Sequence, residues 1–213
     1  MKKRNVFRVF VLALCFTFAL SLVATVSHAK TKGEINSSVK AAMDRFHKQV
    51  KGANEYLKMA KGVLVIPNVT KAGFVVAGQY GQGALKIRHK TVDYYSLAAG
   101  SIGFQVGAEK YDLFILFMTD EALKKFHSGE GWEAGADAEV TLIAAGADVP
   151  VSTLVSQHPI LGFVIDQKGL MGGVSLKGAK FTKIKPDGDI TSGGAIPAPR
   201  HRDPLLLKRD GTR

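Results

Sequence analysis

From Gly62 onward the sequence consists of short apolar runs that glycine and proline interrupt every few residues. Residues 63–66 form one such run, which Pro67 ends, and residues 113–118 are continuously apolar. Short apolar runs between turn residues predict strands, and a continuous run predicts a strand that is buried on both faces. The chain is therefore expected to fold around a β-sheet.

Six further segments carry strand patterns. They are residues 74–80, 84–87, 102–108, 139–144, 160–165 and 170–176. In the third of these, bulky residues alternate with small or polar ones, a period of two that predicts one bulky face and one small face. The Gly-Gln-Gly triplet at 81–83 is expected to form a turn or bulge. Residues 166–169 are expected to form a hairpin turn before the last segment.

Before the strands, residues 34–61 show the period of an amphipathic helix. Apolar residues recur there at spacings of three and four and fall on one helical stripe: Ile35, Val39, Met43, Phe46, Val50, Ala53 and Leu57. Asn36 or Ser37 is the expected N-cap. Gly52 leaves open whether the segment is one helix or two.

A second helix is expected over residues 119–129, within the strand region. Thr119 can cap it, acidic residues follow at its positive end, and basic residues occupy its last turn. Asp112 and Asp120 flank a buried run and are interpreted as end caps. The predicted fold class is α+β, with an N-terminal amphipathic helix or helices packed on a mostly antiparallel, Gly-rich sheet and one further internal helix. That sheet can curl towards a barrel.

Residues 1–29 have the layout of a secretory signal peptide. Basic residues precede an apolar run of about fourteen residues, and Ser27-His28-Ala29 offers small residues at a cleavage site. The alternative is an uncleaved anchor helix, because the apolar run approaches the ~20 residues of a membrane span. A lipoprotein is not expected, because Leu14, the residue before Cys15, is not small. We expect export, and a periplasmic or cell-envelope location peripheral to the membrane.

The positive charge is concentrated near the start of the exported part. The chain has 29 Lys and Arg residues against 18 Asp and Glu residues, a net charge of +11. Residues 30–61 hold eight basic and three acidic residues, and the remainder of the exported part is close to balanced. We expect one domain over residues 30–185 and a flexible or strapped tail over 186–213. Export makes nucleic acid an unexpected partner.

Few residues have the spacing of a catalytic or metal site. Residues 99–103 resemble a variant nucleophile elbow, but Ser101 would begin an alternating strand, whereas an elbow needs a strand–turn–helix. The glycine-rich residues 78–83 lack the dinucleotide-binding spacing. The histidines do not show metal-ligand spacing, and no close carboxylate pair marks an acid–base site. We therefore expect no enzyme activity, no cofactor and no metal.

A surface property carries the functional prediction. A basic amphipathic segment can lie on an anionic bilayer, where each lysine contributes on the order of 1 kcal/mol. The candidate lipid-binding residues are Lys40, Arg45, Phe46, Lys48, Val50, Lys51 and Lys58. The basic side chains would attract the membrane, and Phe46 or another apolar residue would insert. In the alternative, the apolar stripe packs on the sheet while the lysines face water.

Several sequence blocks resemble the SYLF domain in order and spacing. They are AKGVLVIP at 60–67, KAGFVVAGQYGQG at 71–83, SIGFQVG at 101–107, DLFILFMT at 112–119, GADA at 135–138 and KGLMGGVSLKG at 168–178. The resemblance covers residues 36–184. Several ordered blocks are more specific than any one of them, so the chain is identified as similar to this family.

The resemblance implies lipid binding without catalysis. Eukaryotic members bind phosphoinositides, yeast members also bind and bundle actin, and bacterial members are exported lipid-binding proteins. Actin is not an expected partner in an exported context. The prediction is peripheral binding of anionic lipid at the cell envelope. The alternative is a structural protein that binds an envelope protein partner without lipid contact.

Overall fold

The computed structural model describes residues 30–73, 76–102, 107–143, 150–171 and 175–187, and the structural statements below refer to these residues. Its helices are α2 (Lys32–Gln49), α3 (Ala53–Met59), α4 (Asp120–Ser128) and α5 (Val151–Gln157). Its strands are β1 (Gly62–Gly73), β2 (Val76–Ile87), β3 (Lys90–Ile102), β4 (Gly107–Phe117), β5 (Gly131–Glu133), β6 (Thr141–Leu142), β7 (Ile160–Ile165) and β8 (Lys180–Ile184). The expected leader at 1–29 and residues 188–213 of the expected tail lie outside this part of the chain.

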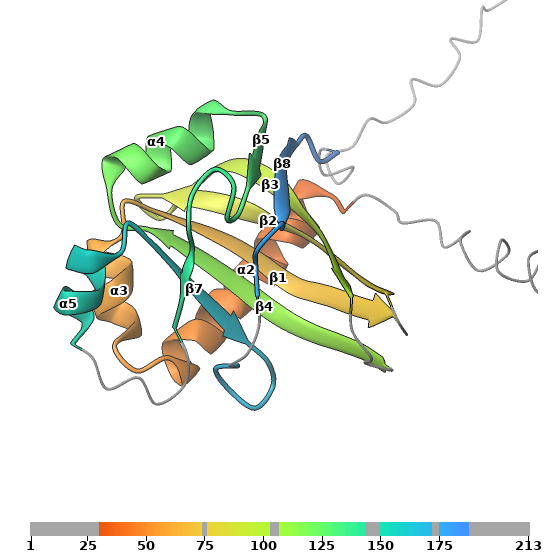
Figure 1. Ribbon diagram of the computed structural model, residues 1–213, viewed down its shortest axis with the longest axis horizontal. Helices are drawn as coiled ribbons and strands as arrows, with labels where there is room; N and C mark the ends of the chain where they lie inside the picture. The colour runs from red at the N-terminus through yellow and green to blue at the C-terminus, as the bar shows by residue number, and fades with distance from the viewer. Residues whose placement is uncertain (1–29, 74–75, 103–106, 144–149, 172–174, 188–213) are drawn as a thin grey trace, which may run out of the picture.

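The described strands form one sheet of order β5-β8-β3-β2-β1-β4-β7-β6. Neighbouring strands are antiparallel, except that β6 and β7 are parallel. The sheet curls strongly, with α4 at one side and α2, α3 and α5 at another (Figure 1). The predicted α+β class and the mostly antiparallel sheet are confirmed.

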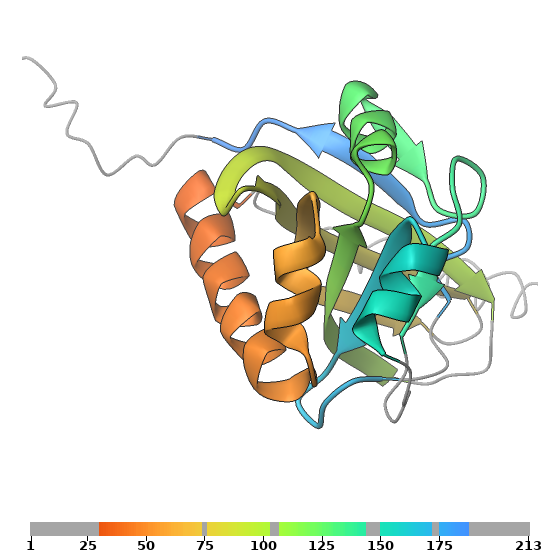
Figure 2. The same cartoon turned by 90° about the vertical axis from the view of Figure 1, so that its left-hand side faces the viewer.

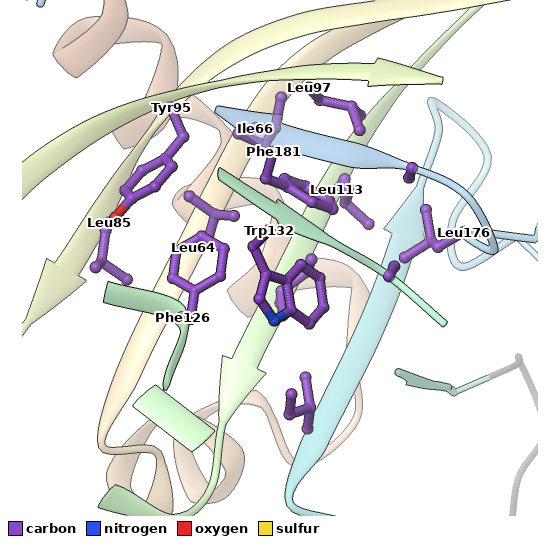
Figure 3. Packing of buried hydrophobic residues seen from close by; sticks show 14 of the residues in the cluster. Leu64, Ile66, Leu85, Tyr95, Leu97, Leu113, Phe126, Trp132, Leu176 and Phe181 are labelled. Atoms are coloured by element: carbon purple, nitrogen blue, oxygen red, sulfur yellow. The ribbon is translucent and has the colours of Figure 1, made fainter. Parts of the chain in front are cut away.

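Side chains on both faces of the central strands are buried. Leu64 and Ile66 of β1 face a cluster that includes Phe126, Trp132 and Phe181, beneath α4 and β5 (Figure 3). The neighbouring residues 63 and 65 face the opposite cluster, where α2, α3 and α5 cover the sheet (Figure 2). Strand β4 alternates between the same two clusters, so the prediction of a strand buried on both faces is confirmed.

The N-terminal segment forms two helices. Gly52 is the N-cap of α3 and has φ 78°, a left-handed conformation that favours glycine. The segment therefore breaks at the position that the sequence left open. The second expected helix is α4, and Thr119 caps it by accepting a hydrogen bond from the Ala122 amide at 3.1 Å.

Several strand predictions were wrong in their boundaries. Residues 81–83 are not a turn, because β2 runs through them as one strand, but the bulge alternative is supported, since the register with β1 shifts opposite them, between Val65 and Thr70. The alternating segment 102–108 is divided between the end of β3 and the start of β4. The turn at 166–169 is confirmed, since the Asp166 amide donates to the Gly169 carbonyl at 3.0 Å. After this turn, the described part of 170–176 holds only an isolated bridge between Leu170 and Ile165.

A bulge in β1 bends the centre of the sheet. Residues 67 and 68 of β1 lie opposite the single residue Asp112 of β4, which shifts the register between Ile66 and Val69. Pro67 has no amide hydrogen to contribute to a ladder, and Asn68 is left-handed with φ 53°. The extra residue of a bulge increases the local twist and bends the strand, consistent with the strong curl of this sheet.

Two buried tyrosines make stability sensitive to alkaline pH. Burial raises the pKa of Tyr111 to about 12, and burial also raises the pKa of Tyr95, relative to about 10 in an unfolded chain. Below pH ~10 both phenols are protonated in both states. Above it the unfolded state loses these protons first, so the free energy of unfolding falls as pH rises from about 10 to 12.

The same two tyrosines should respond oppositely to phenylalanine at neutral pH. The Tyr111 hydroxyl donates to Gln79 Oε1, whereas the Tyr95 hydroxyl has no hydrogen-bond partner among the described residues. We expect Tyr111→Phe to lower the free energy of unfolding by about 1–3 kcal/mol, because the buried Gln79 oxygen loses its donor. Tyr95→Phe should raise it slightly. Urea denaturation at pH 7 and pH 11 measures both effects. An equal loss of the free energy of unfolding in the two variants at pH 7 would contradict the hydrogen bonding assigned to the two hydroxyls.

No helix among the described residues is both long and apolar enough to cross a bilayer.

Candidate functional site

Helix α2 is fixed at its start by a reciprocal pair of hydrogen bonds. Thr31 Oγ1 accepts from the Glu34 amide at 3.3 Å, and the Glu34 carboxylate accepts from the Thr31 amide at 2.7 Å. This capping box makes Thr31 the N-cap, so the expectation of Asn36 or Ser37 was wrong. Asn36 instead ties the helix to β3, because its Nδ2 donates to the Tyr94 hydroxyl at 2.9 Å.

The apolar stripe of α2 is buried against the sheet. Phe46 is fully buried, and its ring centroid lies 4.6 Å from that of Phe114 and 5.2 Å from that of Phe163. Val50 is also buried. In the docked helix, neither side chain is available to insert into a membrane. The alternative drawn from the sequence, in which the apolar stripe packs on the sheet, therefore describes this face of α2.

Arg45 lies on one flank of α2 and is bound to Asp112 of β4, the residue opposite the bulge in β1. Its Nε donates to Asp112 Oδ2 at 2.6 Å, and Asp112 Oδ1 accepts from the Asn68 amide at 2.9 Å. Asp112 is buried, and the hydrogen bond with it raises the pKa of Arg45. Asp112 is thus not an end cap, because it lies within β4 and neutralises Arg45. Arg45 therefore holds α2 to the sheet through a buried carboxylate and does not belong to the exposed lysine surface.

The four lysines among the candidate residues are exposed. Lys40 and Lys48 lie on α2, Lys51 follows it, and Lys58 lies on α3. These side chains are exposed, and the opposite, apolar face of α2 is buried against the sheet that lies behind the helix in Figure 2. The structure therefore separates the predicted set into exposed cations, two buried apolar residues and one paired arginine.

The other flank of α2 lines a groove of about 910 Å³. Met43 and His47 are one helical turn apart on this flank, and α3 contributes Leu57 and Lys58 to the lining. The end of the β2–β3 hairpin, residues 86–89, also lines the groove. Its volume lies at the upper end of the range for small-molecule sites.

The apolar residues that line the groove are buried or half-buried and form its floor, whereas the basic ones are mostly exposed and form its rim. Side chains of Met43, Leu57, Val63, Ile87 and Leu123 supply apolar surface. The basic lining residues are His47, Lys58, Lys61, Lys86, Arg88 and His89, against the single carboxylate of Asp120. Asp120 lies 3.8 Å from the Lys61 ammonium. Lys58, Lys86 and Arg88 have no carboxylate partner among the described residues, so the rim keeps an excess of positive charge.

The turn between β2 and β3 places two of these basic residues. Ile87 pairs with Lys90, so Arg88 and His89 form a two-residue hairpin turn. Both have positive φ, 48° and 66°. Such a turn strongly prefers Asn-Gly or another glycine-containing pair, and left-handed backbone costs a side-chain-bearing residue roughly 1–2 kcal/mol. This turn is built from two basic side chains at the expense of local stability.

The sequence interpretation missed the residues that β1, β2 and the hairpin contribute to the groove. Lys61, Lys86, Arg88 and His89 were not singled out, because no Asn-Gly or Gly-Gly pair marked a turn between them. The available signal was the basic cluster Lys86-Ile-Arg-His-Lys90, which follows a strand pattern. Ser101, the weak catalytic candidate, lies near the end of β3 with its backbone opposite Ala77. It therefore lacks the strand–turn–helix setting of a nucleophile elbow.

Comparison with known proteins bears on this fold. Residues 98–187 match the model of a family described as "Ysc84: Las17-binding protein actin regulator". Protein YSC84 of Saccharomyces cerevisiae is 27% identical, over 74% of this chain and 38% of that protein. Over these residues the chain is similar to the Ysc84, or SYLF-domain, family. The resemblance drawn from the sequence blocks is confirmed.

Other relatives place the Ysc84 domain in longer proteins. LAS seventeen-binding protein 3 of Saccharomyces cerevisiae is 28% identical over 74% of this chain, and SH3 domain-containing YSC84-like protein 1 of Homo sapiens is 28% identical over 59%. The chain spans about two-fifths of the length of each relative. Similarity alone therefore does not assign the activities of these whole proteins to this chain.

Proposed function

We propose that this chain is a non-enzymatic binding protein that attaches peripherally to anionic lipid membranes through the exposed lysines of its N-terminal helices. One observation carries the proposal, the separation of charge along the fold. Residues 30–61, which contain α2 and α3, hold eight basic and three acidic residues, whereas residues 62–187 hold twelve of each. An anionic surface is attracted to a segment with this imbalance.

The exposure of the lysines supports contact without insertion. Lys40, Lys48, Lys51 and Lys58 face solvent while the apolar stripe remains docked. At about 1 kcal/mol for each lysine near a charged membrane, four of them contribute roughly 4 kcal/mol, an affinity that is useful and reversible. Insertion of Phe46 or Val50 forms no part of this proposal, because both are buried.

Charge reversal on the helices provides the test. We expect wild-type protein to sediment with vesicles that contain anionic phospholipid and to remain in solution with phosphatidylcholine vesicles. High salt should release it, because salt screens interactions between exposed charges. The triple variant Lys40→Glu, Lys48→Glu and Lys51→Glu should lose most of the binding at low salt. Co-sedimentation at low and high salt measures the bound fraction.

A variant with the same net charge separates location from total charge. The triple variant Lys110→Glu, Lys124→Glu and Lys168→Glu changes exposed lysines outside α2 and α3. It should keep most of the binding. An equal loss in both triple variants would show that total charge, rather than the helical surface, drives attachment.

The second candidate is a protein-binding role. It is favoured by the family description, which names Las17 binding and actin regulation. If anionic and neutral vesicles both leave the wild-type chain in solution, the lipid proposal is wrong and this candidate replaces it. The expected export leader makes an envelope protein a more suitable partner than actin.

A further inference from the structure

The groove beside α2 has the chemistry of a site for one lipid molecule. A surface that only attracts a membrane electrostatically needs exposed cations but no cavity. Here, a groove of about 910 Å³ lies next to those cations and shares Lys58 with them. Its apolar floor and basic rim match an amphiphile that carries a negative head on a short apolar stem.

We propose that this groove binds the headgroup region of a single anionic phospholipid, drawn from the membrane to which the helices attach. The inference deepens the proposed function and rests on it. The lipid phosphate would lie among Lys58, Lys86 and Arg88, which have no carboxylate partner among the described residues. The glycerol and first methylenes would contact Met43 and Leu57 on the floor.

The strained turn supports a binding role for its side chains. Arg88 and His89 both adopt left-handed backbone in a two-residue loop that lines the groove. Strain of this kind persists where surrounding structure enforces it, and it gathers at ligand-binding sites. The more stable Asn-Gly turn would remove both basic side chains from the rim. The strain is thus the local consequence of placing two basic groups over the groove.

The apolar floor separates this site from one for a free phosphate ion. Met43 and Leu57 are half-buried. They pack against the core cluster that α2, α3 and α5 cover, and they also line the groove. Inorganic phosphate could occupy the rim but would gain nothing from these side chains. A phospholipid satisfies both parts, because its phosphate accepts hydrogen bonds from the basic groups while its methylenes cover apolar surface.

The test uses a short-chain lipid, which reports on the groove without a bilayer surface. The full chain is titrated calorimetrically with dihexanoylphosphatidic acid below its micelle concentration. Parallel titrations use dihexanoylphosphatidylcholine and sodium phosphate. We expect saturable binding of the phosphatidic acid with a stoichiometry of one, and at least tenfold weaker binding of the other two.

A turn variant separates binding from stability. Arg88→Asn with His89→Gly creates the preferred hairpin turn, so it should raise Tm by roughly 2–4 °C and weaken phosphatidic acid binding about tenfold or more. Lys168→Asn is the matched control, because Lys168 is an exposed cation in another turn. It should leave the affinity unchanged.

The possible results distinguish this inference from the proposed function. Undiminished binding by the turn variant would overturn the groove assignment, as would sodium phosphate binding as tightly as phosphatidic acid. Vesicle attachment without saturable binding of phosphatidic acid would overturn the groove and leave peripheral attachment standing. Saturable binding that the turn variant loses, without vesicle attachment, would support the groove and overturn the surface mechanism.

Discussion

Gly83→Ala is expected to prevent stable folding. A Cβ at this position of β2 would lie 1.8 Å from the Val65 carbonyl oxygen and 2.7 Å from the Ile66 Cα atom. Both atoms belong to the backbone of β1, so no side-chain rotation can relieve the overlap. The two strands would have to separate at the centre of a sheet that is buried on both faces. We expect a loss of more than about 4 kcal/mol, a large part of the 5–15 kcal/mol that stabilises a typical domain.

Gly78 provides the control on the same strand. A Cβ there meets no atom within 4 Å, and alanine restricts the unfolded chain more than glycine does. Gly78→Ala should therefore be neutral or slightly stabilising. Soluble yield and thermal melting followed by circular dichroism compare the two variants. Similar melting curves for both would show that β1 and β2 are not in the close contact described.

Phe46→Ala is expected to have the second large effect. The ring is fully buried between α2 and the sheet, where it contacts Phe114 and Phe163. Replacing such a buried ring by alanine typically lowers the free energy of unfolding by about 3–5 kcal/mol, because apolar contact is lost and a cavity remains. Urea denaturation measures the loss.

This substitution also tests the earlier expectation that Phe46 inserts into a membrane. If α2 leaves the sheet at the membrane to insert Phe46, alanine should weaken vesicle attachment in addition to lowering the stability of the unbound protein. If α2 stays docked, stability should fall and the fraction bound by the folded protein should be unchanged. Met59→Ala is the control, because Met59 is an apolar residue of α3 that is 37% exposed. It should change stability by no more than ~0.5 kcal/mol.

The elements with strong periodicity were predictable. The α2 stripe and the continuous run in β4 placed their residues in the core, and Thr119 marked the start of α4. Predictions failed where contacts distant in sequence decide the outcome. Residues 81–83 contain two glycines, which suggests a turn, but these glycines continue β2 because its backbone lies close against β1. Nothing local in the sequence indicates that contact.

The candidate site was predictable only in part. Lysines on the polar face of α2 follow from the helical period, so their exposure could be expected. The pairing of Arg45 could not be expected, because its partner Asp112 lies 67 positions away in the sequence. The rim of the groove was missed for a different reason. Arg88 and His89 occupy a turn that local preference assigns to Asn and Gly, so turn preferences did not mark it, and the basic cluster at residues 86–90 was the remaining signal.

The chain of contacts from Asn68 through Asp112 to Arg45 also defines which residues of β1 and β4 can lie side by side. If β1 slid by one residue, the Asn68 amide would move away from the Asp112 carboxylate, and every β1 side chain would change face. The carboxylate would then remain buried with one donor fewer, and α2 would have to dock on the wrong side chains. A buried polar group that loses a partner is strongly unfavourable. The bulge therefore fixes the register between β1 and β4, and α2 docks correctly only on a sheet in that register.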